Sequence, residues 1–135
     1  MESKKQSLKE RTKQFGIKVI KLVENFPKNY VANILVRQLL RSATSVGANY
    51  RAVCRARSKP DFISKMGIVE EEIDETLYWL ELFIETNLMN KEEVQHLLDE
   101  ANEITAMVVA SINTAKKNQK RNRIKNRRNA EEVVL

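Results

Sequence analysis

Residues 49–82 read NYRAVCRARSKPDFISKMGIVEEEIDETLYWLEL, and they indicate the architecture of the chain more clearly than any other segment. Its first part closes a helix whose outer face carries only basic charge. Its second part opens a helix crowded with carboxylates. Between them, Ser58 can cap the second helix, with Asp61 three residues later in a pattern close to a capping box. Pro60 is tolerated in a first turn, so the sequence predicts two long helices that meet at a tight turn.

The same division by charge extends over the whole chain. Residues 1–59 hold 14 Lys or Arg and 3 Asp or Glu, whereas residues 60–115 hold 2 Lys or Arg and 13 Asp or Glu. Residues 116–128 add eight basic residues and no acidic one, and Glu131 and Glu132 bring the net charge of the chain to +6. Such a chain can pair its own halves, pair head to tail with copies of itself, or offer its basic half to a polyanion.

Apolar residues recur every three or four positions over four segments, which predicts helices over about 7–25, 31–57, 59–86 and 91–117. Pro27 ends the first helix, and Asn90 can cap the last. Connections of about four residues favour an all-α, up-down-up-down four-helix bundle. We therefore expect one domain over 1–115. The basic tail over 116–135 loses its apolar period, so we expect frayed helix passing into disorder.

The third predicted helix carries more apolar side chains than one core stripe needs. Its core stripe holds Phe62, Met66, Val69, Ile73, Leu77, Leu80 and Ile84. A second apolar set lies off that stripe and comprises Ile68, Trp79, Leu82 and Phe83. On the other side, an acidic ridge holds Glu70, Asp74, Glu81 and Glu85. Because a bundle buries one stripe per helix, we expect the second set and the ridge to form a subunit interface.

The stretch QLLRSATSVGANYRAVCRARSKPDFISKMGIVEEEIDETLYWLEL, residues 38–82, resembles the four-helix-bundle family named after 23S rRNA intervening-sequence proteins. The resemblance covers about residues 10–115. It implies an up-down four-helix bundle assembled as a ring, typically a homopentamer. The family is similar in fold to the accessory protein of diversity-generating retroelements, which binds a reverse transcriptase and nucleic acid. That role is not transferred to this chain, because the two sequences are not obviously similar.

Two groups of basic residues are candidates for binding nucleic acid. The tail residues are Lys116, Lys117, Lys120, Arg121, Arg123, Lys125, Arg127 and Arg128; the second predicted helix adds a stripe of Arg37, Arg41, Arg51 and Arg55, continued by Lys59. The stripe could contact phosphates, or it could form salt bridges with Glu70, Asp74, Glu81 and Glu85 in the same chain or a neighbour. The tail could bind a polyanion or only improve solubility. No aromatic residues interleave with the tail, so we do not expect base stacking.

Nothing in the sequence indicates catalysis, a cofactor or a metal. His96 is the only histidine, and Cys54, the only cysteine, lies on the predicted core arc as a small apolar side chain. The carboxylates of residues 70–75 point away from the predicted core and lack the Glu-x-x-His pairs of di-metal bundles. Gly16, Gly47 and Gly67 are isolated within helices, which predicts close helix contacts rather than a phosphate-binding loop.

We therefore expect a non-enzymatic, cytoplasmic protein that forms a homo-oligomer. The sequence has no transmembrane stretch, and the N-terminal segment MESKKQSLKERTKQ has no apolar run of the kind found in signal peptides. The expected activity is non-specific binding of RNA or DNA, alone or as a scaffold for a protein partner such as a nucleic-acid enzyme. The alternative is a structural protein–protein interaction module whose charges serve only self-assembly.

Overall fold

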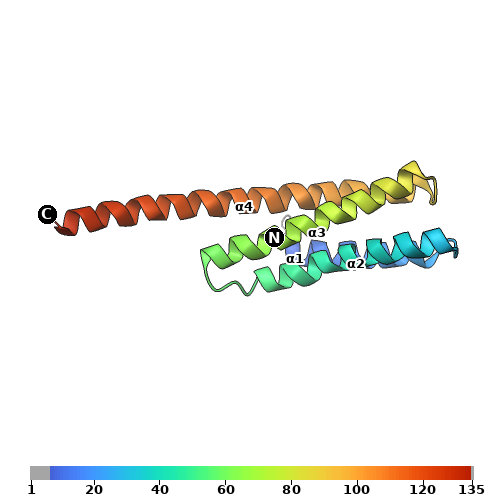
Figure 1. Cartoon of the computed structure of the whole chain (residues 1–135), viewed down its shortest axis with the longest axis horizontal. Coiled ribbons are helices and arrows are strands. Elements are labelled where there is room, and N and C mark those ends of the chain that lie inside the picture. Colours follow the sequence, from blue (N-terminus) through green and yellow to red (C-terminus); the bar gives the residue numbers. More distant parts are fainter. Residues whose placement is uncertain (1–6, 135) are drawn as a thin grey trace.

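The computed structural model describes residues 7–134, and within this range the chain forms four helices and no strand. They are α1 (Leu8–Glu24), α2 (Tyr30–Val53), α3 (Lys59–Glu85) and α4 (Lys91–Val134). Consecutive helices run in opposite directions, and α4 closes the bundle by packing beside both α3 and α1 (Figure 1). The all-α class is confirmed. Residues 1–6 and Leu135, which the predicted domain boundaries include, lie outside the described residues.

Side-chain caps mark the start of each helix. The Ser7 hydroxyl accepts a hydrogen bond from the backbone N–H of Glu10, and the Ser58 hydroxyl accepts one from the backbone N–H of Asp61, each at 3.2 Å. The Asn29 side chain accepts from the backbone N–H of Ala32 at 2.9 Å, and Asn90 caps α4 in the same manner. These bonds satisfy backbone donors that a helix leaves without partners at its first turn. The predicted caps at Ser58 and Asn90 are therefore confirmed.

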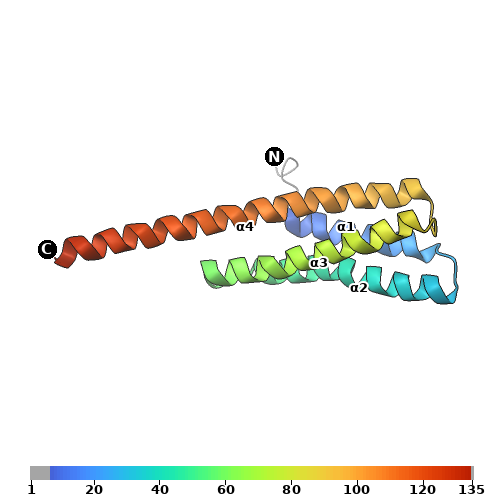
Figure 2. The ribbon, with the colours of Figure 1, turned by 45° about the horizontal axis from the view of Figure 1, so that its top comes forward.

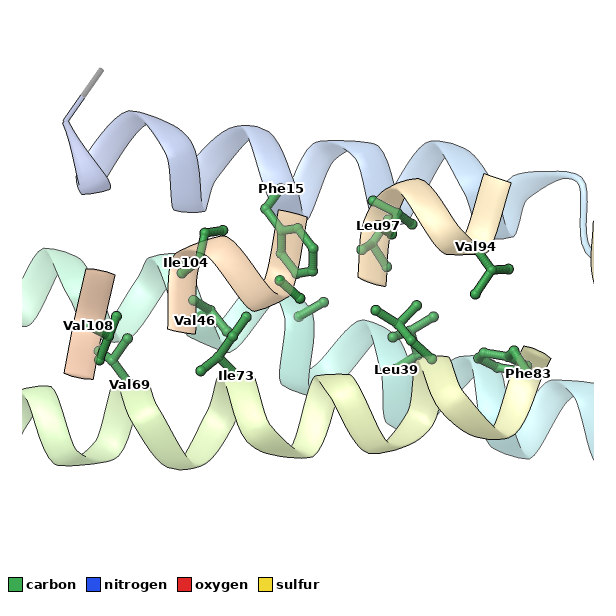
Figure 3. Packing of buried hydrophobic residues seen from close by; sticks show 14 of the residues in the cluster. Phe15, Leu39, Val46, Val69, Ile73, Phe83, Val94, Leu97, Ile104 and Val108 are labelled. Atoms are coloured by element: carbon green, nitrogen blue, oxygen red, sulfur yellow. The ribbon is translucent and has the colours of Figure 1, made fainter. Parts of the chain in front are cut away.

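The core lies along the bundle axis, where each helix contributes one row of apolar side chains (Figure 3). The fully buried members with the largest side chains include Phe15 of α1, Leu39 of α2, Ile73 and Phe83 of α3 and Ile104 of α4. Burial of such a side chain contributes about 1.5–3 kcal/mol relative to its exposure. Most of the positions predicted from the 3–4 spacing are buried or packed against this core.

The prediction that Phe83 lies at a subunit interface is wrong, because this side chain belongs to the core of a single copy. The side chain is 0% exposed, and its ring centroid lies 4.9 Å from that of Phe26. The turn that follows α1 brings Phe26 over the end of α3, so the core is wider there than a single stripe per helix. The second apolar set is therefore divided. Phe83 belongs to the core, Trp79 packs against it, and Leu82 is half-buried. Ile68 remains 43% exposed.

One polar pair is buried between α2 and α3. The hydroxyl oxygens of Ser42 and Thr76 lie 3.0 Å apart, and both side chains are fully buried. The carbonyls of Leu39 and Glu72 accept from this pair, so neither hydroxyl lacks a partner. The pair is consistent with the rule that buried polar groups are hydrogen-bonded. Periodicity alone did not identify it.

The glycines meet different surroundings. A Cβ added to Gly47 would lie 3.3 Å from the carbonyl oxygen of Thr12, so α1 and α2 approach closely there. A Cβ on Gly16 would make only ordinary contacts, and one on Gly67 would meet nothing within 4 Å. The prediction of a close helix contact is confirmed at Gly47 and wrong at Gly67.

The end of α2 also differs from the prediction. The helix ends at Val53 rather than near Arg57, and Cys54 lies in the turn with an exposed side chain. The 3–4 spacing of core residues applies only while the backbone is helical. The prediction that Cys54 lies in the core is therefore wrong, because it extended this spacing one residue beyond the end of α2. The exposed turn that follows carries Arg55, Arg57 and, at the start of α3, Lys59.

Candidate nucleic-acid interface

The last part of α4 extends beyond the other three helices as a single rod (Figures 1 and 2). Asn118 is still beside α3, because it lines a shallow groove together with Lys59 and Phe62. From Lys120 to Val133 every side chain is exposed. At about 1.5 Å per residue, this part of the helix is about 20 Å long.

This extension corrects the prediction that the tail frays into disorder. The helix continues to Val134. Between Lys91 and Val134 there is no glycine or proline, and Lys, Arg, Gln, Glu and Ala are all good helix formers. Because α4 is already formed inside the bundle, the tail needs no new nucleus and adds residues to an existing helix. Loss of the apolar period ended the core, but it did not end the helix.

All eight predicted tail cations are exposed on this segment: Lys116, Lys117, Lys120, Arg121, Arg123, Lys125, Arg127 and Arg128. Within residues 7–134 none of them forms an ion pair. The first carboxylates after them are Glu131 and Glu132. The segment therefore presents concentrated positive charge to solvent.

The predicted basic stripe on α2 is not uniform. Arg41 donates to Glu75 at 2.6 Å and to Glu72 at 3.3 Å. The hydrogen bond from Arg41 lowers the pKa of Glu75, and the two carboxylates raise the pKa of Arg41. In this structure Arg41 is therefore engaged with α3. The carboxylates differ from the four predicted ones, because Glu72 and Glu75 lie on the flank of α3 that faces α2.

The rest of the stripe is available at the surface. Arg37, Arg51 and Arg55 are exposed, and none of the three is ion-paired in the part of the chain that the structure describes. On α3, Asp74, Glu81 and Glu85 are exposed, and Glu70 is half-buried. The predicted charged faces are thus present, but they do not pair with each other within the described chain.

Additional cations gather at the end of the bundle from which α4 projects. Arg51 lines a groove between α1 and α2 with Lys9 and Lys13. Arg51 also lines a second groove with Arg55 and Lys65 of α3. Sequence reasoning missed Lys9, Lys13 and Lys65, because these grooves form only where the start of α1 and the end of α2 lie side by side. The antiparallel order of the helices was the signal that could have identified them.

A different ion-pair cluster ties α1 to α4. Arg11 pairs with Glu100 and, at 2.6 Å, with Glu103. Hydrogen bonds to these carboxylates raise the pKa of Arg11. These charges hold helices together, so they are not available to a ligand. Sequence reasoning did not identify this cluster.

The part of the chain that the structure describes holds no group of three or more His, Cys, Asp or Glu side chains arranged to bind a metal. His96 is exposed on α4. Among residues 7–134, no helix combines the length and the apolar character needed to span a bilayer.

Residues 4–110 match the sequence profile of the family described as 23S rRNA-intervening sequence protein. The chain is also similar to a crystal structure described as a protein with unknown function from the S23 ribosomal protein family of Bacteroides thetaiotaomicron VPI-5482. That similarity has a TM-score of 0.71 at 34% sequence identity, and it covers 78% of this chain and 98% of that chain. No curated protein matches the chain.

Proposed function

The chain belongs to the 23S rRNA-intervening sequence protein family, and we propose that it is a non-enzymatic bundle that assembles with copies of itself and binds RNA or DNA through the projecting helix. We place this activity in the cytoplasm. The protein acts alone or as a scaffold for a nucleic-acid enzyme, and it needs no cofactor.

One observation carries the proposal. Eight exposed cations follow one another over 13 residues of a helix, and no ion pair within residues 7–134 neutralises them. A polyanion that binds such a segment releases its condensed counterions, which drives association without reading sequence. Lys9, Lys13, Arg51, Arg55 and Lys65 enlarge the basic surface where the helix leaves the bundle.

Self-assembly is supported by groups that a single copy leaves exposed on α2 and α3. Ile68 and Tyr78 of α3 are 43% and 53% exposed. Arg51 on α2 and Arg55 in the turn that follows it have charge complementary to that of Glu81 and Glu85 on α3. Heterologous pairing of such faces closes a ring when the rotation between copies permits it. A homopentameric ring, which the family resemblance implies, is the assembly we propose.

The ion pairs of Arg41 favour a second candidate function. These pairs show that part of the basic stripe serves the fold itself. If the remaining charges serve only contacts between copies, the protein is a structural interaction module without a nucleic-acid ligand.

A truncation separates the two candidates. A chain that ends at Thr114 keeps every buried core residue except Ala115 but lacks all eight tail cations. We expect it to lose at least about a hundredfold in affinity for mixed-sequence RNA and DNA at 0.1 M salt. The control replaces four exposed lysines elsewhere on the bundle, Lys18, Lys21, Lys28 and Lys91, with Gln. It removes half as many cations as the truncation, so the logarithm of its affinity should fall by far less than half as much. Equal binding by the truncated and full chains would reject the role of the tail.

Assembly needs its own test. Reversal of charge in Arg51→Glu/Arg55→Glu should lower the particle mass in light scattering, because like charges would then face each other across the contact. The control Lys18→Glu/Lys21→Glu makes the same charge change at exposed positions of α1, outside the stripe. An unchanged mass in the first variant would show that Arg51 and Arg55 do not pair with a neighbouring copy.

A further inference from the structure

The face of α4 that is buried inside the bundle continues beyond it as a row of carboxamides. Within the bundle this face carries Val94, Leu97, Ala101, Ile104, Val108, Ile112 and Ala115, all buried. The same spacing of three and four residues then reaches Gln119, Asn122, Asn126 and Asn129, with Asn118 beside them. At about 100° per residue these five side chains, here called the amide stripe, fall within an arc of about 100°.

The eight cations flank the amide stripe on both sides. The first ridge holds Lys116, Lys120, Arg123 and Arg127, and the second ridge holds Lys117, Arg121, Lys125 and Arg128. Each ridge is centred roughly 110–120° around the helix from the centre of the stripe. The remaining surface, opposite the stripe, carries Ile124 and Glu131, and Glu132 follows the second ridge at its C-terminal end. The segment therefore has a neutral hydrogen-bonding face between two positive borders.

This pattern excludes several occupants of the amide face. An apolar partner would leave the carboxamides without hydrogen bonds, which is costly for a buried polar group. A second copy of the same segment would bring cations against cations, because both borders of the stripe are positive. In Figures 1 and 2, no other helix of residues 7–134 runs alongside α4 beyond the end of the bundle, whereas Asn118, at the start of the stripe, still lines a groove with α3. The suitable ligand has hydrogen-bonding groups in the middle and negative charge on both sides.

The major groove of duplex DNA has this arrangement, because base edges lie between two phosphate strands. We propose that the α4 extension lies in the major groove of duplex DNA, with the amide stripe against base edges and one basic ridge against each strand. This inference rests on the proposed nucleic-acid binding and narrows it to one kind of duplex and one face of the helix.

The dimensions and the chemistry agree with this placement. A helix with its side chains is about 10–12 Å across, and the groove is about 12 Å wide. Asn and Gln carboxamides can pair with the N6 and N7 groups of adenine. A-form RNA has a deep and narrow major groove that does not admit a helix. The full chain should therefore prefer duplex DNA to duplex RNA.

The first experiment compares the two duplexes by fluorescence anisotropy at 0.1 M salt, with 20-base-pair DNA and RNA of the same mixed sequence. We expect the full chain to bind the DNA at least about tenfold more tightly. Asn122→Ala/Asn126→Ala should reduce DNA affinity about tenfold and leave RNA affinity unchanged, because two base-edge contacts are lost. Asn113→Ala, on the opposite face of α4, is the matched control and should bind like the parent. Circular dichroism checks that helix content is retained.

The second experiment compares the ridges. Replacement of all four residues of either ridge with Gln removes the same charge and keeps good helix formers. Both variants should lose a similar factor in DNA affinity, at least about a hundredfold, because each ridge contacts one strand. If only one of the two variants loses DNA affinity, a single side of the helix contacts the phosphate backbone, and the proposal is overturned.

The outcomes separate this inference from the function on which it rests. Equal binding of the two duplexes, or an unchanged DNA affinity in the amide variant, rejects the major-groove placement but leaves general nucleic-acid binding intact. Failure of the full chain to bind either duplex or single strands rejects both.

Discussion

Replacement of Phe83 with Ala tests whether this side chain belongs to the core of one copy or to a contact between copies. The residue is fully buried and packs against Phe26. Truncation of a buried Phe costs about 3–5 kcal/mol, from the lost transfer free energy and the cavity that remains. The free energy of unfolding of a domain of this size is about 5–15 kcal/mol, so the variant loses a large share of its stability. With a urea dependence of about 2 kcal/mol per molar, the unfolding midpoint should fall by about 2 M.

The assay is urea unfolding followed by circular dichroism, at several protein concentrations. The matched control is Ile68→Ala, which lies on the same helix in a half-exposed position and should lose less than about 1.5 kcal/mol. The difference between Phe83→Ala and the parent should not change with protein concentration. A loss below about 1 kcal/mol, or a difference that disappears on dilution, would refute the assignment of Phe83 to the core.

Three further predictions concern stability. Thr76→Val should lower the free energy of unfolding by about 1–2 kcal/mol, measured by chemical denaturation. The double change Ser42→Ala/Thr76→Val should lower it by less than the sum of the two single changes, because no hydroxyl is then left without its partner. Additive losses would argue against the pair. Gly67→Ala should raise the free energy of unfolding by about 0.5–1 kcal/mol, because Ala favours the helix and its Cβ meets nothing within 4 Å. Gly47→Ala should give no such increase, because its Cβ would meet the carbonyl oxygen of Thr12. Equal increases in the two variants would contradict the close approach of α1 and α2 at Gly47. A hydrogen bond from the Arg57 backbone and another from Lys65 lower the pKa of Asp61, so its stabilisation is present at neutral pH and is lost in acid. Thermal midpoints measured from about pH 5 to pH 3 should therefore fall more for the parent than for Asp61→Asn, and parallel falls would count against this account.

Much of the fold could be predicted from the sequence because its signals are local. Pro27, Ser58 and Asn90 mark helix boundaries by backbone chemistry that does not depend on tertiary contacts. The 3–4 spacing of apolar residues identified most of the core. Phe83 could not be placed in this way, because its burial depends on Phe26, which lies 57 positions earlier in the chain. The helical state of the tail was misjudged, because loss of amphipathicity was read as loss of helix.

The candidate site was predictable in composition but not in arrangement. The eight tail cations are plain in the sequence, but their distribution into two ridges has meaning only on a continuous helix. The grooves that join Lys9 and Lys13 to Arg51 require the packing of α1 against α2. The pairing of Arg41 with Glu72 and Glu75 depends on which flank of α3 faces α2. Such features are set by the rotation of each helix about its axis, which spacing alone leaves open.

If the projecting helix binds nucleic acid through its eight cations, the affinity of the full chain must depend steeply on salt concentration. In a titration of the full chain with duplex DNA from about 50 to 200 mM salt, the logarithm of the association constant should fall against the logarithm of the salt concentration with a slope near −7. Each of the eight neutralised phosphates contributes about −0.9 to this slope. A slope shallower than about −2, or the same slope in the chain that ends at Thr114, would contradict the claim.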